Sequence, residues 1–589
     1  MKSSSKTEES RSEGPERGAE GATSPEREAW LLQDFLLRAV DRHPDKCVLV
    51  AGGERYSYRR LLDDAAALAF ALRARGLVPG DRVLIYMDNT WPCVVSICGA
   101  LLAGGVFLVV NPQTKADKLR FILQDSGARA LLSDGHLAKV LLPALAEGGH
   151  PSLAEGASLA EGERPSVTQG ASLTEGGQPS ATDGTSNAEG AEGGHPSILV
   201  SSGQAPQGFT AFDALLAEGR EAARAAGSAL PDPARIPIDL ASLIYTSGST
   251  GSPKGVMMTH QSMVFAAESI SHYLRLGPGD RILNALPLAF DYGLYQLLMT
   301  LRLGATLVLE RSFTYPAQVL KVLEEEEATV FPGVPTIYAM LLSLHRRKKL
   351  SFPTVRRITN TAAALPKEFL RELSEIFPNA LIFKMYGLTE CKRVAYLEPE
   401  DLPHKPDSVG KAIPGTQVSV LDEAGRPVPP GEVGVLHVRG PHVMLGYWNR
   451  EDLSREMLRE GPLPGERMLC AQDLFRMDEE GYLYFVGRSD DIIKTRGEKV
   501  SPIEIENCLH GMPGIREAAV LGVEDPILGQ AIRAYVVLEP GAELSEKDIK
   551  KYCLAHLENF MVPKEVCFRD SLPKTTTGKI RKKGLLEDA

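Results

Sequence analysis

The chain has 589 residues, of which 43% are hydrophobic and 24% are charged, and its formal net charge is -11. This composition is typical of a globular protein, and the length predicts at least two domains. The negative charge argues against a general nucleic-acid binder, because phosphate contacts require a basic surface. The eight cysteines include no Cys-x-x-Cys pair, which favours a reduced, cytoplasmic protein over a disulfide framework or a zinc site.

The first part of the chain combines a polar tail with a regular α/β pattern. Residues 1–28 are charged and lack an apolar core, so they predict a disordered tail and no secretory signal. From Ala29 onward, short runs of Val, Leu and Ile alternate with helical patterns, which is typical of an α/β fold. The apolar stretch from Trp91 to Val110 is broken at Gly104, and this break predicts a helix followed by a strand rather than a membrane span.

Residues 146–197 interrupt the α/β pattern with a low-complexity segment. They are rich in Gly, Ala, Ser, Glu and Pro, and the dipeptide Pro-Ser recurs at Pro151, Pro165, Pro179 and Pro196. The repeats contain few large apolar residues, so they cannot stack into a solenoid. We therefore predict a disordered loop inserted into the domain.

The segment from Leu243 to Met257 reads LIYTSGSTGSPKGVM. A buried strand leads into small and hydroxyl residues, whose backbone amides can turn toward an anion, and then to a lysine. The segment is not a Walker A loop, and a flexible linker is the alternative, although linkers rarely follow a buried strand directly. The residues that we expect to bind phosphate are Thr246, Ser247, Gly248, Ser249, Thr250, Gly251 and Lys254.

A second motif runs from Met385 to Glu390 and reads MYGLTE. The face of Tyr386 can stack on a purine, Thr389 can donate a hydrogen bond to a phosphate, and Glu390 can hold Mg²⁺. Together the two motifs resemble the signatures of the adenylate-forming superfamily, which includes acyl-CoA synthetases, stand-alone adenylation enzymes and firefly-type luciferases. The YGxTE motif of that superfamily is matched in full, with Gly387 as its glycine.

The resemblance implies a fold and a reaction. The fold is α/β, with a large N-terminal multi-sheet domain over residues 29–488, a small mobile C-terminal α+β domain over residues 489–589, and an active site at their interface. The reaction joins a carboxylate to AMP with release of pyrophosphate and then transfers the acyl group to a thiol. In the C-terminal region, Ser501-Pro-Ile-Glu504 is a capping-box pattern that predicts a helix start.

Two further segments are similar to the nucleotide-binding segments of the superfamily. Ile358–Pro366 resembles the adenine-side segment, in which the small residues Ala362 and Ala363 let a flat purine approach. Ala471-Gln472-Asp473 replaces the usual Thr-Gly-Asp. The carboxylate of Asp473 can accept from two ribose hydroxyls at once, so we expect ribose binding to survive with some change in affinity.

The C-terminal motifs carry the residues that the resemblance assigns to the two half-reactions. Residues 487–497 resemble the hinge motif, which implies Arg488 near the ribose, Asp490 at the hinge and Lys494 on the face used for thioester formation. The segment around Lys579 resembles the PKTxxGK motif. An ammonium placed between the carboxylate and the α-phosphate lowers the repulsion between the two anions. We therefore expect Lys579, Thr389 and Lys494 to be catalytic.

The substrate segment leaves two alternatives open. Pro287–Gly293 falls where the superfamily builds its acyl pocket, and Phe290-Asp291 resembles the version in amino-acid-activating enzymes. A buried Asp291 requires a partner, which is either a substrate amine or a protein group such as Arg393. Further residues that we expect to line the pocket are Tyr292, His260, Asn360 and Met385.

These observations predict an AMP-forming acid–thiol ligase that uses ATP and Mg²⁺. The thiol acceptor is CoA or a phosphopantetheinyl carrier protein acting in trans, because too few residues follow Lys579 for a carrier domain. The expected partners are a small carboxylic acid and, in one alternative, a separate acyl or peptidyl carrier protein, with no nucleic acid and no integral membrane segment. The competing interpretations are a stand-alone amino-acid adenylation enzyme, a luciferase-like oxygenase and a nucleotide-binding pseudoenzyme.

Overall fold

The structure is a computed structural model of the whole chain. It describes residues 29–146, 196–227, 229–247, 253–361, 365–488, 491, 493–495, 498–525, 529–557, 559–574, 580–582 and 584–585. The predicted tail lies outside these ranges. So does the predicted repeat segment, except for its end residues 146, 196 and 197.

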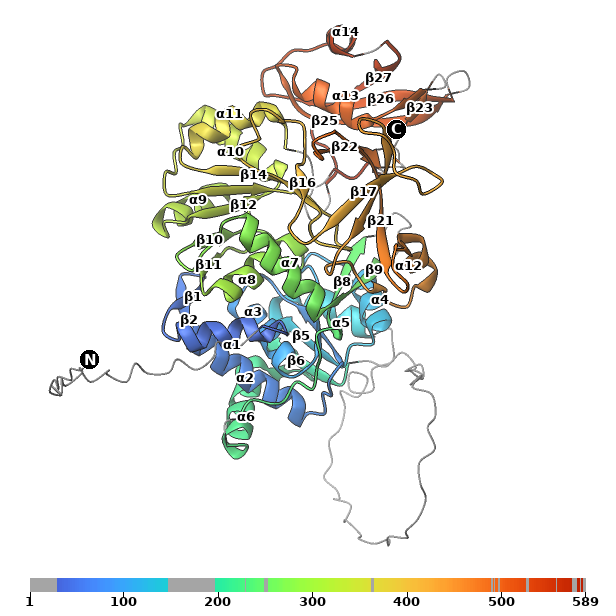
Figure 1. Cartoon of the computed structure of the whole chain (residues 1–589). Helices are drawn as coiled ribbons and strands as arrows, with labels where there is room; N and C mark the ends of the chain where they lie inside the picture. Colours follow the sequence, from blue (N-terminus) through green and yellow to red (C-terminus); the bar gives the residue numbers. More distant parts are fainter. Residues whose placement is uncertain are drawn as a thin grey trace, which may run out of the picture.

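An eight-stranded sheet forms one end of the molecule (Figure 1). Its order is β19-β9-β8-β4-β3-β5-β6-β7, and the strands from β8 to β7 are parallel. The central strands are runs of Val, Leu, Ile and Phe that are buried on both faces, as expected where helices cover a parallel sheet. The strands are β3 (Arg82–Tyr86), β4 (Val106–Val109), β5 (Ala130–Asp134), β6 (Ile198–Ser202), β7 (Thr210–Ala211), β8 (Leu240–Ser247), β9 (Pro253–Thr259) and β19 (Gly446–Tyr447).

A nine-stranded sheet lies next along the molecule, with the order β16-β15-β14-β13-β12-β10-β11-β1-β2. Its six central strands, from β14 to β1, are parallel, so their carboxyl ends meet at one edge. The strands are β1 (Cys47–Ala51), β2 (Glu54–Ser57), β10 (Arg281–Asn284), β11 (Thr306–Leu309), β12 (Val330–Gly333), β13 (Arg357–Asn360), β14 (Leu381–Tyr386), β15 (Ala395–Leu397) and β16 (Lys411–Ala412).

Helices pack between and around the two sheets. Helix α7 packs on β8 and β9 of the first sheet, α8 packs on β10 and β11 of the second, and the two helices pack on each other. One continuous apolar core therefore joins the two sheets. The helices of this part are α1 (Gln33–Arg42), α2 (Tyr58–Ala74), α3 (Trp91–Leu102), α4 (Ala116–Ser126), η1 (Gly135–Leu137), α5 (Ala138–Ala146), α6 (Phe212–Ala225), α7 (His260–Tyr273), α8 (Asp291–Leu303), α9 (Pro316–Glu325), α10 (Pro335–Arg347) and α11 (Lys367–Ile376).

A third, antiparallel sheet adjoins the second one. Its order is β17-β18-β21-β20, and β22 also pairs with β21. The elements are β17 (Gln417–Leu421), β18 (Val433–Arg439), α12 (Glu451–Met457), β20 (Leu458–Glu460), β21 (Arg467–Met477) and β22 (Leu483–Arg488).

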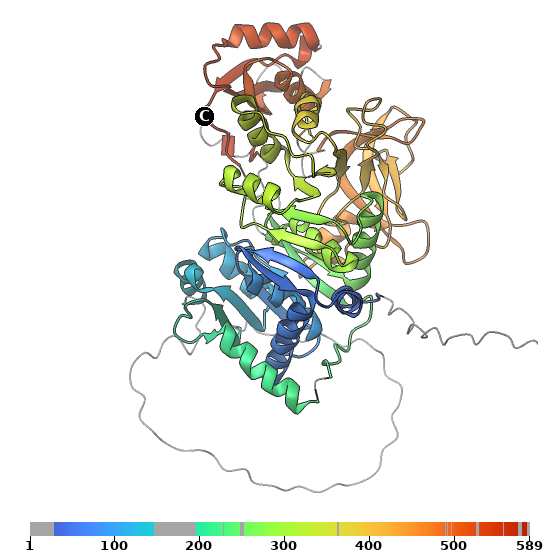
Figure 2. The same ribbon diagram turned by 90° about the vertical axis from the view of Figure 1, so that its left-hand side faces the viewer.

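The C-terminal unit is a small α+β structure with its own apolar core, at the end of the molecule opposite the first sheet (Figures 1 and 2). Its sheet has the order β24-β23-β26-β25, with β27 paired to β26. An ion pair of 2.9 Å between Arg346 and Glu539 links it to α10. The elements are β23 (Ile493–Thr495), β24 (Glu498–Val500), α13 (Pro502–His510), β25 (Ile515–Asp525), β26 (Gly529–Leu538), α14 (Glu546–His556), η3 (Asn559–Met561) and β27 (Glu565–Phe568).

These observations confirm the predicted fold class and correct one detail. Helix α13 begins after Ser501 as expected, but Ser501 makes no side-chain capping bond. Its hydroxyl donates instead to the carbonyl of Val486 in β22, which joins the C-terminal unit to the third sheet. All eight cysteines are unbridged thiols. Within the described ranges, no helix combines the length and apolarity needed to cross a bilayer.

Candidate active site

Strands β8 and β9 form an antiparallel hairpin that holds part of the predicted phosphate-binding segment. Thr246 near the end of β8 lies directly opposite Lys254 in β9. The hydroxyl of Tyr245 donates to the carboxylate of Asp125 over 2.7 Å, which ties the hairpin to α4. The hairpin therefore presents Thr246 and Lys254 together, and Ser247 is the last residue of β8. The predicted residues Gly248, Ser249, Thr250 and Gly251 lie outside the described ranges, as do Ala362 and Ala363.

The tyrosine of the MYGLTE motif meets the aspartate predicted to bind ribose. Tyr386 ends β14, and its hydroxyl donates to the carboxylate of Asp473 in β21. Arg488 is the register partner of Asp473 in β22, with 3.6 Å between its Nε atom and the carboxylate. Burial, together with the Asp473 charge, holds the pKa of Tyr386 well above its ordinary value. Three residues from separate motifs thus converge, and Asp473 is 7% exposed.

The backbone conformation of Gln472, the residue before Asp473, explains why the superfamily usually has glycine at this position. Gln472 has a φ of 55°, in the left-handed region that favours glycine. The preceding residue, Ala471, is buried in the core. The chain therefore keeps the backbone turn that presents Asp473 while carrying a side chain at a position where glycine is less strained.

Glu390 and Lys254, predicted to hold the metal and the phosphates, both lie close to Tyr447, Glu390 at its hydroxyl and Lys254 over its ring. The Tyr447 hydroxyl donates to Glu390 over 2.7 Å, and the Lys254 ammonium lies 5.4 Å from the centre of the Tyr447 ring. Thr389 precedes Glu390 in the same turn, and its carbonyl accepts from Lys392 over 2.9 Å. Tyr447 was missed by sequence reasoning, because nothing in the sequence around it indicates that β19 pairs with β9.

The chain turns back on itself directly after the motif. A Cβ atom on Gly387 would lie 2.1 Å from the carbonyl oxygen of Lys392, so the close crossing requires glycine. This turn buries two cations, because Lys392 is 1% exposed and Arg393 is 4% exposed. Burial lowers the pKa of Lys392 to about 8, whereas the charges of Asp291 and Glu390 act to raise it.

The predicted acyl segment leads into α8 beside these cations. Asp291 begins α8 and is 7% exposed, and Phe290 occupies the N-cap position without a side-chain capping bond. The cation whose charge acts on Asp291 is Lys392, whereas the Arg393 guanidinium lies 4.8 Å above the ring of Tyr292. Within the described ranges Asp291 forms no ion pair with Arg393 or with Lys392, although the charges of Asp291 and Lys392 act on each other.

The other residues of the predicted acyl pocket lie around the same helix. The Tyr292 hydroxyl donates to the carbonyl of Thr359 over 2.7 Å, next to Asn360 at the end of β13. Met385 accepts from the Tyr273 hydroxyl at 3.0 Å. A small cavity of about 10 Å³ lies against Asp291, and apart from Ser242 its remaining lining is apolar, from Phe107, Val109, Ile244, Leu288, Ala289 and Leu294.

His260 is not brought to this group. It begins α7, is 1% exposed, and accepts from the backbone amide of Leu32 over 3.2 Å. Burial and the nearby Arg235 lower its pKa to about 4, so the ring is neutral at physiological pH. Its described contacts join α7 to the segment that precedes α1, and none of them is with the acyl segment.

The predicted C-terminal residues are described only in part. Lys494 is the middle residue of β23, paired with β24. Asp490 and Lys579 lie outside the described ranges. The neighbours of the Lys579 segment are placed: Lys574 forms an ion pair with Glu517, and Lys582 forms one with Glu506, both at 2.9 Å.

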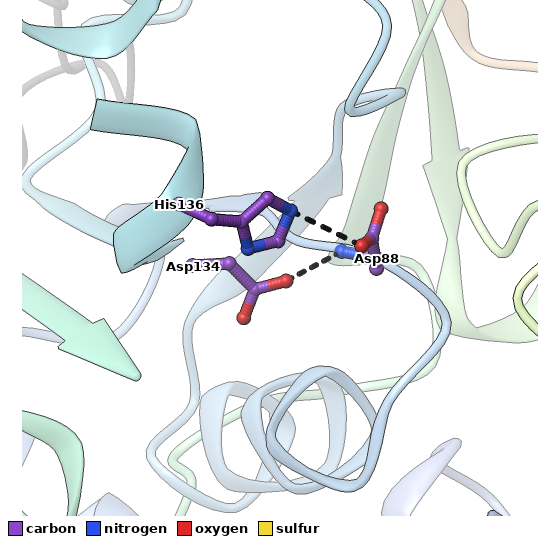
Figure 3. A group of neighbouring side chains, drawn as sticks. All are labelled: Asp88, Asp134 and His136. Atoms are coloured by element: carbon purple, nitrogen blue, oxygen red, sulfur yellow. Dashed lines mark hydrogen bonds and ion pairs between the residues drawn. The ribbon is translucent and has the colours of Figure 1, made fainter. Parts of the chain in front are cut away.

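A separate group of potential metal ligands lies on the first sheet (Figure 3). Asp88 follows β3, Asp134 ends β5, and His136 lies in the short helix after it. Their ligand atoms all lie within 4.8 Å of one another. The Asp134 carboxylate already accepts from the backbone amide of Asp88 and from the Ser202 hydroxyl, and His136 lies 3.2 Å from Asp88. These three side chains therefore already have partners within the protein, and their proximity does not require a metal ion.

The chain matches known proteins along almost its whole length. Residues 36–448 match the AMP-binding enzyme family, and residues 504–579 match the C-terminal domain of that family. A long-chain-fatty-acid–CoA ligase of Escherichia coli O157:H7 is 31% identical, with 96% of each chain covered. One from Bacillus subtilis (strain 168) is 29% identical, over 95% of this chain and 94% of the relative. A feruloyl-CoA synthase of Amycolatopsis sp is 30% identical, over 94% and 97%.

Solved structures agree with the fold. ATP-bound MatB from Rhodopseudomonas palustris has a TM-score of 0.76 at 27% identity, with 94% of this chain and 98% of that chain covered. The anthranilate CoA ligase AuaEII with anthranoyl-AMP has a TM-score of 0.80 at 24% identity, over 95% and 98%, which speaks for the fold alone. With the convergence of Tyr386, Asp473 and Arg488, these matches confirm the family and reaction class expected from the sequence. The chain belongs to the AMP-binding enzyme family and is an AMP-forming ligase of the acyl-CoA synthetase type.

Proposed function

We propose that the enzyme activates a carboxylic acid with an apolar body, fatty or aryl, and transfers it to CoA. The observation that carries this choice is the position of Lys392, whose ammonium supplies the positive charge acting on Asp291 from within the protein. A carboxylate that already faces a buried cation has less need of a substrate amine. The mostly apolar lining of the small cavity beside Asp291 and the long-chain fatty acids and ferulate named for the relatives support the same choice.

Each residue of the site has a part in this proposal. Thr246, Lys254 and the glycine-rich loop between them bind the phosphates of ATP, the face of Tyr386 supports the adenine, and Asp473 with Arg488 binds the ribose. Glu390 would hold Mg²⁺, because one carboxylate oxygen takes the Tyr447 hydroxyl and the other can serve as a ligand. The ion would neutralise phosphate charge during attack on the α-phosphate.

The C-terminal residues complete the two half-reactions. Lys579 bridges the carboxylate and the α-phosphate during adenylation, and its positive charge lowers their repulsion. Rotation about Asp490 then replaces Lys579 with the β23 face that carries Lys494, toward which the CoA thiol approaches. One active site thus serves both steps in turn, in the cytoplasm, where ATP and CoA are available.

The test is acid-dependent release of pyrophosphate from MgATP, measured over fatty, aryl, short-chain and amino acids. We expect release with fatty or aryl acids and formation of the CoA thioester in the same mixture. The Asp291→Asn variant should keep the substrate profile of the wild type. Lys579→Ala should lose adenylation by roughly a hundredfold or more, yet still convert a supplied acyl-adenylate to the thioester.

Other outcomes would contradict the proposal. Release with amino acids alone, lost in Asp291→Asn, would assign Asp291 to a substrate amine and point to a separate peptidyl carrier protein as acceptor. The absence of release with every acid, together with measurable ATP binding, would identify a nucleotide-binding pseudoenzyme.

A further inference from the structure

Arg393 is a buried cation that takes no part in the two half-reactions. Its side chain is 4% exposed, and the guanidinium lies 4.8 Å above the ring of Tyr292. One of its terminal nitrogens donates to the backbone carbonyl of Lys392 over 2.8 Å, and the Tyr273 hydroxyl shares a hydrogen bond with it. Among the residues that the structure describes, no carboxylate forms an ion pair with this guanidinium.

Another arginine of the same domain, Arg357, shows the carboxylate partner that a largely buried guanidinium usually has. The Arg357 side chain is 15% exposed and lies 3.0 Å from the carboxylate of Asp280, which is itself 6% exposed. Burying a charge is costly unless an opposite charge or a full set of hydrogen bonds compensates it. Within the described ranges neither Asp291 nor Glu390 forms an ion pair with Arg393, and the Glu390 carboxylate accepts from the Tyr447 hydroxyl.

A second buried polar group, on the helix that carries Tyr292, has no hydrogen-bond partner in the described part of the chain. The hydroxyl of Tyr295, on the first turns of α8, is buried and makes no hydrogen bond. Tyr295 lies three residues after Tyr292 on α8, and therefore on the same face of the helix as the ring that the Arg393 guanidinium covers. Among the described residues, the Tyr295 hydroxyl has no acceptor, and the Arg393 guanidinium has no anion. These two unmet requirements indicate that a hydrogen-bond acceptor from outside the chain binds to them.

Arg393 and Tyr295 lie next to the predicted acyl segment. Tyr292, over which the guanidinium stacks, follows Asp291, and Tyr273 connects Arg393 to Met385 of the MYGLTE motif. On the strength of the proposed function, we infer that Arg393 and Tyr295 bind a second anionic group of the acid, at a distance from the carboxylate that reacts. The substrate class is then a dicarboxylic acid, or an apolar acid with another anionic substituent.

The test compares matched acids that differ only in the distal group. Pyrophosphate release is measured with octanoate and octanedioate, and with the corresponding pairs from four to twelve carbons. The variants are Arg393→Met, which removes the charge at similar length, and Arg393→Lys, which keeps it. Arg275→Met is the control, because Arg275 is 44% exposed and pairs with Glu398 and Glu400 at the surface.

We expect the wild type to prefer the diacid at one chain length. Arg393→Met should lower the ratio of kcat/KM for diacid over monoacid by roughly 10- to 100-fold, the range expected for loss of a charge-assisted hydrogen bond. Arg393→Lys should retain part of the preference, Arg275→Met all of it, and the KM for ATP should stay constant in each. Stabilisation of the wild type by the diacid in a thermal shift, absent in Arg393→Met, provides the same comparison without turnover.

The opposite results would overturn the inference. A wild type that prefers the monoacid at every length, with a ratio unchanged in Arg393→Met, would leave Arg393 with a purely structural role. If Arg393→Met does not fold, the wild type alone decides, because a wild type that prefers the monoacid at every length contradicts the inference. If no acid supports pyrophosphate release, the proposed function fails, and the thermal shift with the diacid still decides whether Arg393 binds an anion.

Discussion

The two edges of the nine-stranded sheet use buried charge in different ways. At the amino edge, where the parallel strands begin, the Asp280 carboxylate accepts from Arg357 over 3.0 Å and from the Thr329 hydroxyl over 2.8 Å. Arg281 is paired with Glu326 at the same edge. The described charges of this edge therefore satisfy one another, and what they stabilise is the sheet.

At the carboxyl edge the described charges are buried more deeply, yet they form no ion pair with one another. Asp291 follows β10, and Lys392 and Arg393 follow β14. Asp291 and Lys392 act on each other through their charges, and Arg393 lies on an aromatic ring. Ligands bind at the carboxyl ends of parallel strands in open α/β sheets. The pairing of buried charge therefore distinguishes the edge that serves stability from the edge that serves the substrate.

The largest effect on stability should come from breaking the pair at the amino edge. Asp280→Asn leaves Arg357 buried without its carboxylate, so we expect the free energy of unfolding to fall by about 3 kcal/mol, measured by urea denaturation. The KM for ATP should not change. Asp422→Asn removes a carboxylate of an exposed pair with Arg426 and should cost less than about 0.5 kcal/mol. Equal losses in the two variants would contradict the comparison.

A smaller effect should appear in the dependence of stability on pH. Burial lowers the pKa of Lys392 and of Lys384 to about 8, from an ordinary value of 10.5. Between pH 8 and 10.5 the unfolded chain keeps a proton that the folded chain has lost, so stability rises with pH in this window, by at most about 3 kcal/mol for each lysine.

Substitution by methionine separates the two lysines. Lys392→Met and Lys384→Met should each flatten the rise of unfolding free energy from pH 8 to 10.5, because each removes one of the titrating groups. Lys384 donates to the carbonyl of Pro406, so its variant should turn over the acid normally, whereas Lys392→Met should not. Two variants with profiles as steep as the wild type would show that neither lysine titrates there.

The smallest effect should come from the strained residue before Asp473. Gln472→Gly relieves a left-handed φ of 55° and should raise the free energy of unfolding by about 1 kcal/mol or less. Gln472→Ala keeps the strain and serves as the control. A gain of equal size with alanine would show that the side chain, rather than the backbone, is the source of the strain.

The sequence predicted the parts of the site that are encoded within contiguous motifs. Tyr386, Asp473 and Arg488 were each identified from their own segment, and the structure brings them together. The order of strands and helices could also be predicted, because the parallel strands are nearly continuous apolar runs.

The remaining features depend on contacts that no local pattern records. Lys392 could not be identified as the cation for Asp291, because the turn after the motif is set by the close packing at Gly387. Ser501 fits a capping box by sequence, yet tertiary structure offers its hydroxyl the Val486 carbonyl instead. His260 is a polar residue near the motif in sequence, but its ring is used to join two helical segments.

The crossing of Gly387 over the Lys392 carbonyl has a consequence for the divergence of this enzyme. Because backbone atoms make this contact, the close crossing at Gly387 does not depend on which side chain stands at position 392. Residues 391–393 can therefore be exchanged in evolution or in the laboratory without rebuilding the nucleotide site. The turn is a natural position at which to redirect the enzyme toward another acid, provided that Gly387, Thr389 and Glu390 are kept.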